Sequence, residues 1–340
     1  MSKITIVVPV YNVEAYIAKC LDSLLMQDDA DYEVLVVNDG SPANEQPIID
    51  SYAQKDARIH SVVKENGGYG SVLEYAIENI KSEYMLVCDP DDYLYPHTLS
   101  TLVKLIEEKH CDIAIGAKTL VYSDNEEEKY DKSFNEAYAQ LQDGSAYDSD
   151  DVGYDHFYFV DPSPHAKLYR VSLLKDAIFP HKISFTDNIL YFHALNKASR
   201  VVYTSEALAY YLINRVGNTM TDIRITAIDA EIKMLSSLIS HNRNANAIFY
   251  YRMFEAYKYI YNEKINRCNA SEKEVRERLQ SLYNVVALLL PKRVEILHYY
   301  DLYNKYPVIE KMRDHLLLNK FFTVPVYDRM IRKKLKERWK

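Results

Sequence analysis

The stretch Tyr84-Met85-Leu86-Val87-Cys88-Asp89-Pro90-Asp91-Asp92 joins an apolar run to three carboxylates within four residues. The apolar run predicts a buried β-strand, which places the acidic residues at its carboxyl end. Open α/β sheets bind ligands at this edge. Carboxylates this close repel one another unless a cation neutralises them, and hard oxygen ligands suit Mg²⁺ or Mn²⁺. The stretch therefore predicts a site for a divalent metal and a diphosphate, with Asp91, Asp89 and Asp92 as metal ligands.

This stretch has two alternative interpretations. A lone Asp-x-Asp is most often a solvated loop or a helix cap, so the motif gains weight only from the strand before it. A calcium loop of the EF-hand type is excluded, because Leu94 stands where that loop needs glycine and Ser100 where it needs the closing glutamate.

Strands and helices are predicted to alternate on both sides of this stretch. The expected strands cover 4–10, 34–37, 59–63, 85–88 and 113–115, and the expected helices cover 15–26, a segment ending at 80, and 96–109. This alternation is typical of an α/β fold with an open, mostly parallel sheet and helices on both faces.

Two later regions depart from this alternation. Residues 123–155 contain eleven acidic residues and two lysines, which indicates a solvated or mobile insertion. The alternative, which we favour, is a plain exposed loop. From about Thr226 onward, apolar residues recur at helical spacing. We therefore expect an α/β domain over residues 1–222 and an all-helical region over 223–340.

Composition limits the class of protein. The 340 residues are 48% hydrophobic and 26% charged, as in a globular domain, and the net charge of −8 argues against nucleic-acid binding. The four cysteines show no metal-ligand spacing, and no apolar run is long enough to span a bilayer. A cytoplasmic location follows as the expectation.

The C-terminal segment, residues 328–340, is strongly basic. Seven Lys or Arg against Asp328 and Glu337 give it a charge of +5, so the rest of the chain carries −13. Ile331, Leu335 and Trp339 share one helical face, and a basic amphipathic helix can lie on an anionic membrane as a peripheral contact. The alternative is a helix end packed on the helical region.

Three predicted strand ends carry polar residues that suit a nucleotide-sugar. They are Pro9-Val10-Tyr11-Asn12, Asn38-Asp39-Gly40-Ser41 and the acidic stretch after Val87. In a doubly wound sheet these ends can converge. Tyr11 or its backbone turn can pack on a uracil ring, and Asp39 can accept a hydrogen bond from a base N–H. One further carboxylate can hold the ribose hydroxyls, and another the metal on the diphosphate.

With the Asn66-Gly67-Gly68 segment added, the order and spacing of these motifs resemble family 2 glycosyltransferases of the GT-A fold, over roughly residues 3–220. The resemblance implies a nucleotide-sugar donor, a glycan, lipid-linked, teichoic-type or glycoprotein acceptor, and Mg²⁺ or Mn²⁺. It also implies inverting transfer in one displacement, with Asp187 as the general base. The donor-binding residues that it implies are Pro9, Tyr11, Asn12, Asp39, Asn66, Gly67, Asp89 and Arg215.

The chain departs from the family pattern at two places. Val72-Leu73-Glu74 stands where many relatives have Ala-Arg-Asn, so a role of that arginine cannot be carried over. Thr186 precedes Asp187 where many relatives have glutamate, which removes a carboxylate beside the base.

Each site residue has a plain structural alternative. Asp39 could cap a turn, Tyr11 could pack as an ordinary tyrosine, Asp187 could cap a helix, and Asn66-Gly67-Gly68 could be a helix-entry loop. Arg215 could be a surface charge, and His165 and His193 are expected to be structural.

For the whole chain, the alternative to a glycosyltransferase is an inactive sugar-nucleotide-binding or scaffold subunit. A pyrophosphorylase would need a basic, glycine-rich loop after the first strand, and a haloacid-type phosphatase would need its Asp-x-Asp there. The donor sugar, the acceptor and the oligomeric state are not determined by the sequence.

Overall fold

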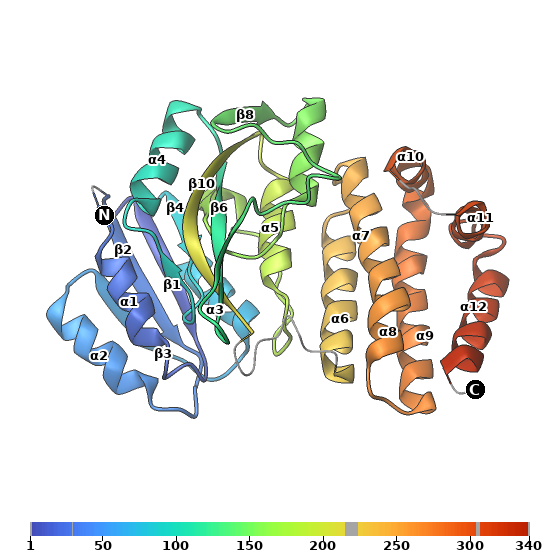
Figure 1. Cartoon of the computed structure of the whole chain (residues 1–340), viewed down its shortest axis with the longest axis horizontal. Coiled ribbons are helices and arrows are strands. Elements are labelled where there is room, and N and C mark those ends of the chain that lie inside the picture. The colour runs from blue at the N-terminus through green and yellow to red at the C-terminus, as the bar shows by residue number, and fades with distance from the viewer. Residues whose placement is uncertain (1, 29, 215–223, 304–306, 339–340) are drawn as a thin grey trace. The chain divides into compact units, whose positions relative to one another are not determined.

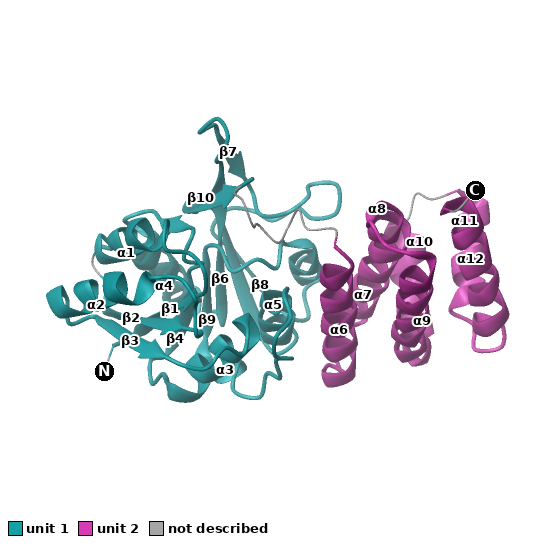
Figure 2. Cartoon of the chain, turned by 90° about the horizontal axis from the view of Figure 1, so that it is seen from below, with its two compact units in different colours: residues 1–218 teal, residues 219–340 magenta. Residues whose placement is uncertain are grey.

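The computed structural model describes residues 2–28, 30–214, 224–303 and 307–338, drawn as coloured ribbons in Figure 1. The chain divides into two compact units, residues 1–218 and 219–340, which are coloured separately in Figure 2. The division expected from the sequence falls between residues 222 and 223.

The first unit is built on a ten-stranded sheet in the order β3-β2-β1-β4-β9-β6-β10-β5, with β7 paired to β6 and β8 paired to β10. Strands β3, β2, β1 and β4 are parallel, as are β6 and β10, whereas β9 runs antiparallel to both β4 and β6. The predicted α/β fold is confirmed, with a sheet that is mixed rather than mostly parallel. The strands are β1 (Ile4–Val10), β2 (Tyr32–Asn38), β3 (Ile59–Val63), β4 (Tyr84–Val87), β5 (Tyr93–Leu94), β6 (Ile113–Tyr122), β7 (Glu128–Asp131), β8 (Ser145–Asp148), β9 (Lys167–Arg170) and β10 (Arg200–Ile213).

Helices cover both faces of the sheet, with α1 and α4 above it and α3 below it in Figure 2. Alternate residues of β1, from Ile4 to Val10, pack in one core with apolar side chains of α1 and α4, while α3 packs against β1 from the other face. The helices are α1 (Ile17–Leu25), α2 (Glu45–Lys55), α3 (Tyr69–Asn79), α4 (Thr98–Glu108) and α5 (Asp187–Leu195), with the 3₁₀ segments η1 (Val152–Phe159) and η2 (Val171–Leu173).

Strand register brings the predicted strand ends together. Val10 pairs with Asn38 across β1 and β2, and Val7 pairs with Val87 across β1 and β4. Because parallel neighbours end at the same edge of a sheet, the residues that follow β1, β2 and β4 lie side by side there.

The expectation of a plain exposed loop over residues 123–155 is wrong. This segment contains β7 and β8, which add to the sheet beside β6 and β10. Its carboxylates are used to fix it: Asp148 pairs with Arg200, and Asp143 accepts hydrogen bonds from Thr204 and from the backbone N–H of Ser205. The acidic composition therefore reflects a solvated surface, while the backbone of this segment is held by strand pairing with β6 and β10.

The second unit is helical, as the sequence predicts. Its core is rich in aromatic rings, with Tyr257, Tyr300 and Tyr327 at most 1% exposed, so many of the chain's 31 tyrosines serve as core residues here. The elements are α6 (Ile225–His241), α7 (Ala247–Tyr259), η4 (Ile260–Lys264), α8 (Ile265–Arg267), α9 (Glu272–Leu289), η5 (Leu290–Lys292), α10 (Arg293–Tyr303), α11 (Val308–Leu317) and α12 (Thr323–Arg338).

The basic C-terminal segment forms most of α12. Ile331 and Leu335 are 8% and 7% exposed, so they pack inward and do not form an outward apolar face. The expectation that these two residues contact a membrane is therefore wrong, and the alternative of a helix packed on the helical region is confirmed for them. Trp339 lies outside the described residues. Among the described residues, no helix is both long and apolar enough to cross a membrane.

Candidate functional site

Asp39, at the end of β2, holds the loop that opens α3. Its carboxylate accepts hydrogen bonds from the backbone N–H of Gly67 (3.0 Å) and of Gly68 (2.7 Å), and Lys64 Nζ lies 2.7 Å from it. Asn66 in turn donates its side-chain amide to the Asp39 carbonyl. Asp39 is 3% exposed, and its Oδ2 retains acceptor capacity beyond the Gly68 bond.

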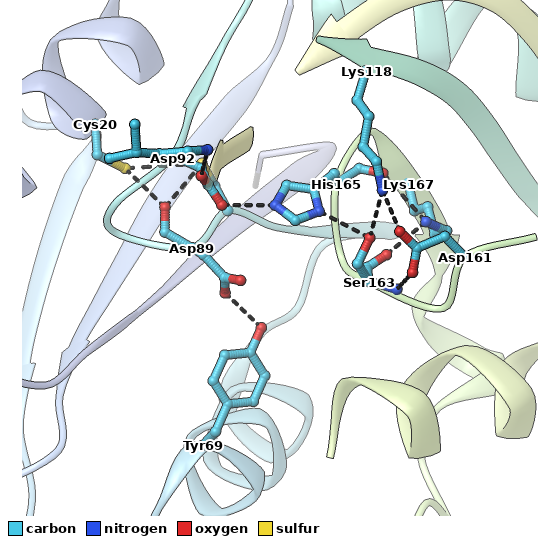
Figure 3. A network of polar contacts seen from close by, with 11 residues as sticks. Cys20, Tyr69, Asp89, Asp92, Lys118, Asp161, Ser163, His165 and Lys167 are labelled. Carbon is cyan, nitrogen blue, oxygen red and sulfur yellow. Dashed lines mark hydrogen bonds and ion pairs between the residues drawn. The ribbon is translucent and has the colours of Figure 1, made fainter. Parts of the chain in front are cut away.

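The same loop reaches the acidic stretch through Tyr69, the first residue of α3. Its hydroxyl donates to Asp89 Oδ1 at 2.8 Å, as Figure 3 shows. Burial, followed by the charges of Asp89 and then Asp187, raises the pKa of Tyr69 well above its usual value. The Tyr69 hydroxyl therefore lies close to two of the predicted site carboxylates.

The loop also supports the segment that carries Asp187. The Lys182 backbone N–H donates to the Gly67 carbonyl at 2.7 Å. A Cβ atom on Gly68 would lie 2.9 Å from the Lys182 nitrogen, and one on Gly70 would lie 2.9 Å from Phe179 Cβ. Close backbone approach at these glycines brings the chain before α5 against the start of α3.

Asp89 lies in a strongly acidic environment. Burial, and then the negative charges of Asp92 and Asp91, raise its pKa well above the usual carboxyl range. Its carboxylate forms a group with Asp92 and His165 in which one ligand atom from each lies within 4.8 Å of the others, and Asp91 is not part of this group. Carboxylate oxygens are the ligands that suit Mg²⁺ or Mn²⁺, and a cation would relieve the repulsion among these carboxylates, so Asp89 and Asp92 fit a divalent metal.

Asp92 is already held by two neighbours. Its Oδ1 accepts from the Leu212 backbone N–H at 2.7 Å, and its Oδ2 lies 2.7 Å from His165 Nε2. Burial, and then the charge of Lys118, lower the pKa of His165 well below its usual value, so the imidazole is neutral. With Ser163 donating to Nδ1, Nε2 donates to Asp92 (Figure 3). His165 would have to release Asp92 in order to bind a metal itself.

Asp187 is the first residue of α5 and is partly buried. Burial raises its pKa to about 6, and the charge of Asp161 adds to this, although hydrogen bonds from Asn188 oppose it. The preceding Thr186 makes no side-chain cap to α5, and its hydroxyl is buried without a partner among the described residues. Asp187 is thus a carboxyl that changes protonation near neutral pH.

A polar network beside Asp187 was not predicted from the sequence. Lys118 and Lys167 are 2% and 0% exposed, and Lys118 pairs with Asp161, whose side chain is 38% exposed (Figure 3). Desolvation opposes ionisation of Asp161, but both lysines hold its pKa below the usual range. The two lysines lie on different strands, β6 and β9, which pair with one another, and this tertiary pairing is not visible in the local sequence.

The remaining predicted residues are placed as follows. Pro9 lies within β1, Tyr11 is 51% exposed just beyond it, and the backbone N–H of Asn12 donates to Ser41 Oγ at 2.9 Å. Asn12 has a positive φ of 56°, a conformation that asparagine tolerates well. Arg215 lies outside the described residues.

A pocket of about 350 Å³ opens beside the glycine loop, lined by Lys64, Asn66, Gly67 and His181 among others. A larger one, about 470 Å³, is lined by Lys3 and Glu107 and lies at the start of β1, away from the acidic stretch. The smaller pocket is therefore the one that adjoins predicted donor-binding residues.

The family model described as glycosyl transferase family 2 matches residues 5–177. The chain belongs to this family. The match contains the three strand ends, the glycine loop and the acidic stretch, which are the motifs that carry the resemblance in the sequence.

Similar proteins include bacterial glycosyltransferases. GlyA of Streptococcus pneumoniae is 31% identical over 222 residues, which is 63% of this chain and 31% of GlyA. An uncharacterized glycosyltransferase of Mycoplasma pneumoniae, the MG025 homolog, is 30% identical over 223 residues, covering 64% of this chain and 70% of the relative. TarS of Staphylococcus aureus, a poly(ribitol-phosphate) beta-N-acetylglucosaminyltransferase, is 28% identical over 235 residues, covering 67% of this chain and 39% of TarS.

The crystal structure of TarS residues 1–349 with UDP-GlcNAc superposes on this family 2 member with a TM-score of 0.72. The two chains are 20% identical, and the match covers 98% of this chain and 91% of the other. At this identity the likeness shows the GT-A fold alone. The chain spans less than half the length of GlyA and of TarS.

Proposed function

We propose that this protein transfers a sugar from a UDP-sugar to a hydroxyl group of a bacterial cell-surface glycan, with inversion at the sugar carbon. TarS is solved with UDP and with UDP-GlcNAc, and its name states a poly(ribitol-phosphate) acceptor, which supports a UDP-sugar donor and a teichoic-type, lipid-linked or other glycan acceptor.

The observation that carries this proposal is the position of the loop Asn66–Gly70. It bonds Asp39 through Gly67 and Gly68, bonds Asp89 through Tyr69, and packs against the segment before Asp187 through Gly70. One short loop thus contacts three parts of the proposed site: Asp39 for the uracil base, Asp89 for the ribose and the metal, and the segment before Asp187, the proposed general base. Stability alone does not require all three carboxylates to lie around one backbone segment, whereas a shared binding site does.

The donor end of the proposed site is formed by the strand ends. Tyr11 offers an exposed ring for the uracil, Asp39 Oδ2 an acceptor for a base N–H, and Asp89 an acceptor for the ribose hydroxyls. Pro9, Asn12, Asn66 and Gly67 shape the backbone around the nucleotide. Arg215 is proposed, from the sequence alone, to contact the diphosphate.

Asp187 is proposed as the general base. A base works best when its pKa lies near the operating pH, and a carboxyl with a pKa of about 6 is ionised at neutral pH yet basic enough to accept the acceptor's hydroxyl proton. The charge of Asp161 acts on Asp187, and the charge of Asp187 acts on Lys167, so these two residues contribute to the electrostatic environment of the general base.

The metal is proposed to be Mg²⁺ or Mn²⁺, held by Asp89 and Asp92 with Asp91 beside them. When bound, it would neutralise the charge that develops on the leaving UDP. His165 keeps Asp92 oriented through its Nε2 bond, and Tyr69 keeps Asp89 oriented through its hydroxyl. The acidic stretch is therefore positioned by its neighbours before any ligand arrives.

The experiment is a panel of UDP-, GDP-, dTDP- and CMP-sugars, incubated with the protein and Mn²⁺ and scored for release of the nucleotide. We expect release from a UDP-sugar, and its loss in Asp89→Ala, which removes a proposed metal ligand. Asp124→Ala, which removes an exposed carboxylate in the 123–155 segment, is the matched control and should keep wild-type release.

Calorimetry with UDP distinguishes two reasons why no nucleotide would be released. Silence across the panel together with tight UDP binding would mean that turnover requires the acceptor. Silence without binding of any of the nucleotides would overturn the proposal and favour the scaffold alternative.

A further inference from the structure

The helical unit exposes an apolar surface on α11. Val308, Ile309, Met312 and Leu316 are 72%, 83%, 61% and 41% exposed. Their spacing of one, three and four residues places them in a single stripe along the helix. The turn that follows adds Phe321 and Phe322, at 76% and 48% exposed.

The opposite face of α11 is buried against its own unit. Asp314 is 1% exposed, accepts a hydrogen bond from Tyr300 of α10 at 2.8 Å, and lies 3.1 Å from Lys258 of α7. Leu317 is fully buried on the same side. These buried contacts hold the opposite face of α11 against the helical unit, so the apolar stripe remains exposed to solvent.

The exposed side chains of helix α12 are largely charged, whereas those of the α11 stripe are apolar. Its inner face packs on the unit: Tyr327 donates to the Leu279 carbonyl of α9, and the Met330 carbonyl accepts from Tyr261. Its exposed charged residues are mostly cationic: Arg329, Arg332, Lys333 and Lys336 stand against Asp328 and Glu337. Helices α11 and α12 contact one another, so their exposed residues belong to neighbouring helices.

We infer that this outer face of α11 and α12 docks on the surface of an anionic lipid bilayer. An apolar stripe with two phenylalanines at its end, beside a cationic stripe, matches the boundary between acyl chains and anionic headgroups. Residues 328–340 carry a charge of +5 and the rest of the chain −13, so positive charge is concentrated in the segment that forms most of α12.

A second copy of the chain fits this face less well. A two-fold contact places the same patch on both subunits, which would bring two cationic stripes together. The inference differs from the membrane contact expected from the sequence, because Ile331 and Leu335 are packed inward and the apolar contact comes instead from α11 and the turn. It does not depend on the proposed transfer reaction.

The test is co-sedimentation of the full chain with vesicles of phosphatidylcholine, with and without about 30% phosphatidylglycerol. We expect binding only to the anionic vesicles, and weaker binding as salt is raised from about 0.1 M to about 1 M. Arg332→Gln/Lys333→Gln/Lys336→Gln should weaken binding about 100-fold. Lys81→Gln/Lys104→Gln/Lys109→Gln removes the same charge from exposed sites of the first unit and should have a much smaller effect.

The apolar contribution is tested separately. Ile309→Ser/Phe321→Ser should weaken binding about tenfold or more without lowering the melting temperature, since both side chains already face solvent. Val152→Ser, at an equally exposed valine of the first unit, is the control. Absence of wild-type binding to anionic vesicles would overturn the inference, as would binding that the α11 and α12 variants leave unchanged. Light scattering that shows a dimer lost in Ile309→Ser/Phe321→Ser, without vesicle binding, would assign the face to a second copy.

Discussion

Asp187 combines partial burial with a pKa raised to about 6, and this sets how activity should depend on pH. A general base must be deprotonated, so the transfer rate should fall about tenfold per pH unit below pH 6 and level off above it. Asp187→Asn should keep UDP affinity and lose about 100- to 10,000-fold in rate. A pH–rate profile and UDP calorimetry on both proteins measure this. Near wild-type turnover in Asp187→Asn would exclude Asp187 as the base.

Asp161 should matter for stability as well as for the charge beside Asp187. Asp161→Ala leaves Lys118 buried without its carboxylate partner, and we expect a loss of about 1–3 kcal/mol in the free energy of unfolding. The matched control is Asp148→Ala, which breaks the ion pair with Arg200 at a far more exposed position and should cost less than about 1 kcal/mol. Urea denaturation of both variants gives the comparison. Equal losses would mean that the Lys118 pair is solvated in solution.

At the scale of elements, the sequence predicts the strands and helices that have a clear apolar periodicity or turn residues at their ends. β1 and β3 were predicted at their observed bounds, and β4 and α4 within two residues, because apolar runs and turn residues mark them. Helix α2 was missed because it contains Pro47 and buries only Glu45 and Ile49, so it lacks an apolar stripe. Strands β7 and β8 were missed because their stability comes from pairing with β6 and β10, which local sequence does not report.

The candidate site shows the same limit. Asp39, Asp89 and Asp187 could be selected because each stands at a strand end or a helix start in a known motif. Tyr69 and Asp161 could not, because the role of Tyr69 comes from a hydroxyl that reaches Asp89, and that of Asp161 from lysines on β6 and β9. Sequence identifies groups by type and position, whereas the partners that tune them are set by tertiary contacts.

The glycine loop before α3 gives an element-scale prediction. Gly68 has φ of 84°, and a Cβ there would meet the Lys182 backbone at 2.9 Å. Gly68→Ala should therefore lower the melting temperature and weaken UDP binding, because both the loop and the segment before Asp187 must shift. Gly144→Ala is the matched control, since φ is 65° there and nothing lies within 4 Å of the added Cβ. It should show only the backbone strain, about 1 kcal/mol, with UDP binding intact. A Gly68→Ala variant as stable as Gly144→Ala would contradict this account of the loop.

On the scale of the whole molecule, the chain holds two separate cores. Leu102 of α4 is fully buried in the first unit, and Leu279 of α9 is fully buried in the second. Each replacement by alanine should cost about 2–5 kcal/mol, because it removes apolar contacts and leaves a cavity.

If each core unfolds as its own cooperative unit, calorimetry should show two transitions, and each variant should lower only one of them. UDP should raise only the transition that Leu102→Ala lowers, because a ligand stabilises the unit that binds it. Leu279→Ala should then leave UDP affinity unchanged below its own transition. A single transition lowered by both variants would instead show that the two units fold as one, and the helical unit would have to be counted as part of the structural support of the nucleotide site.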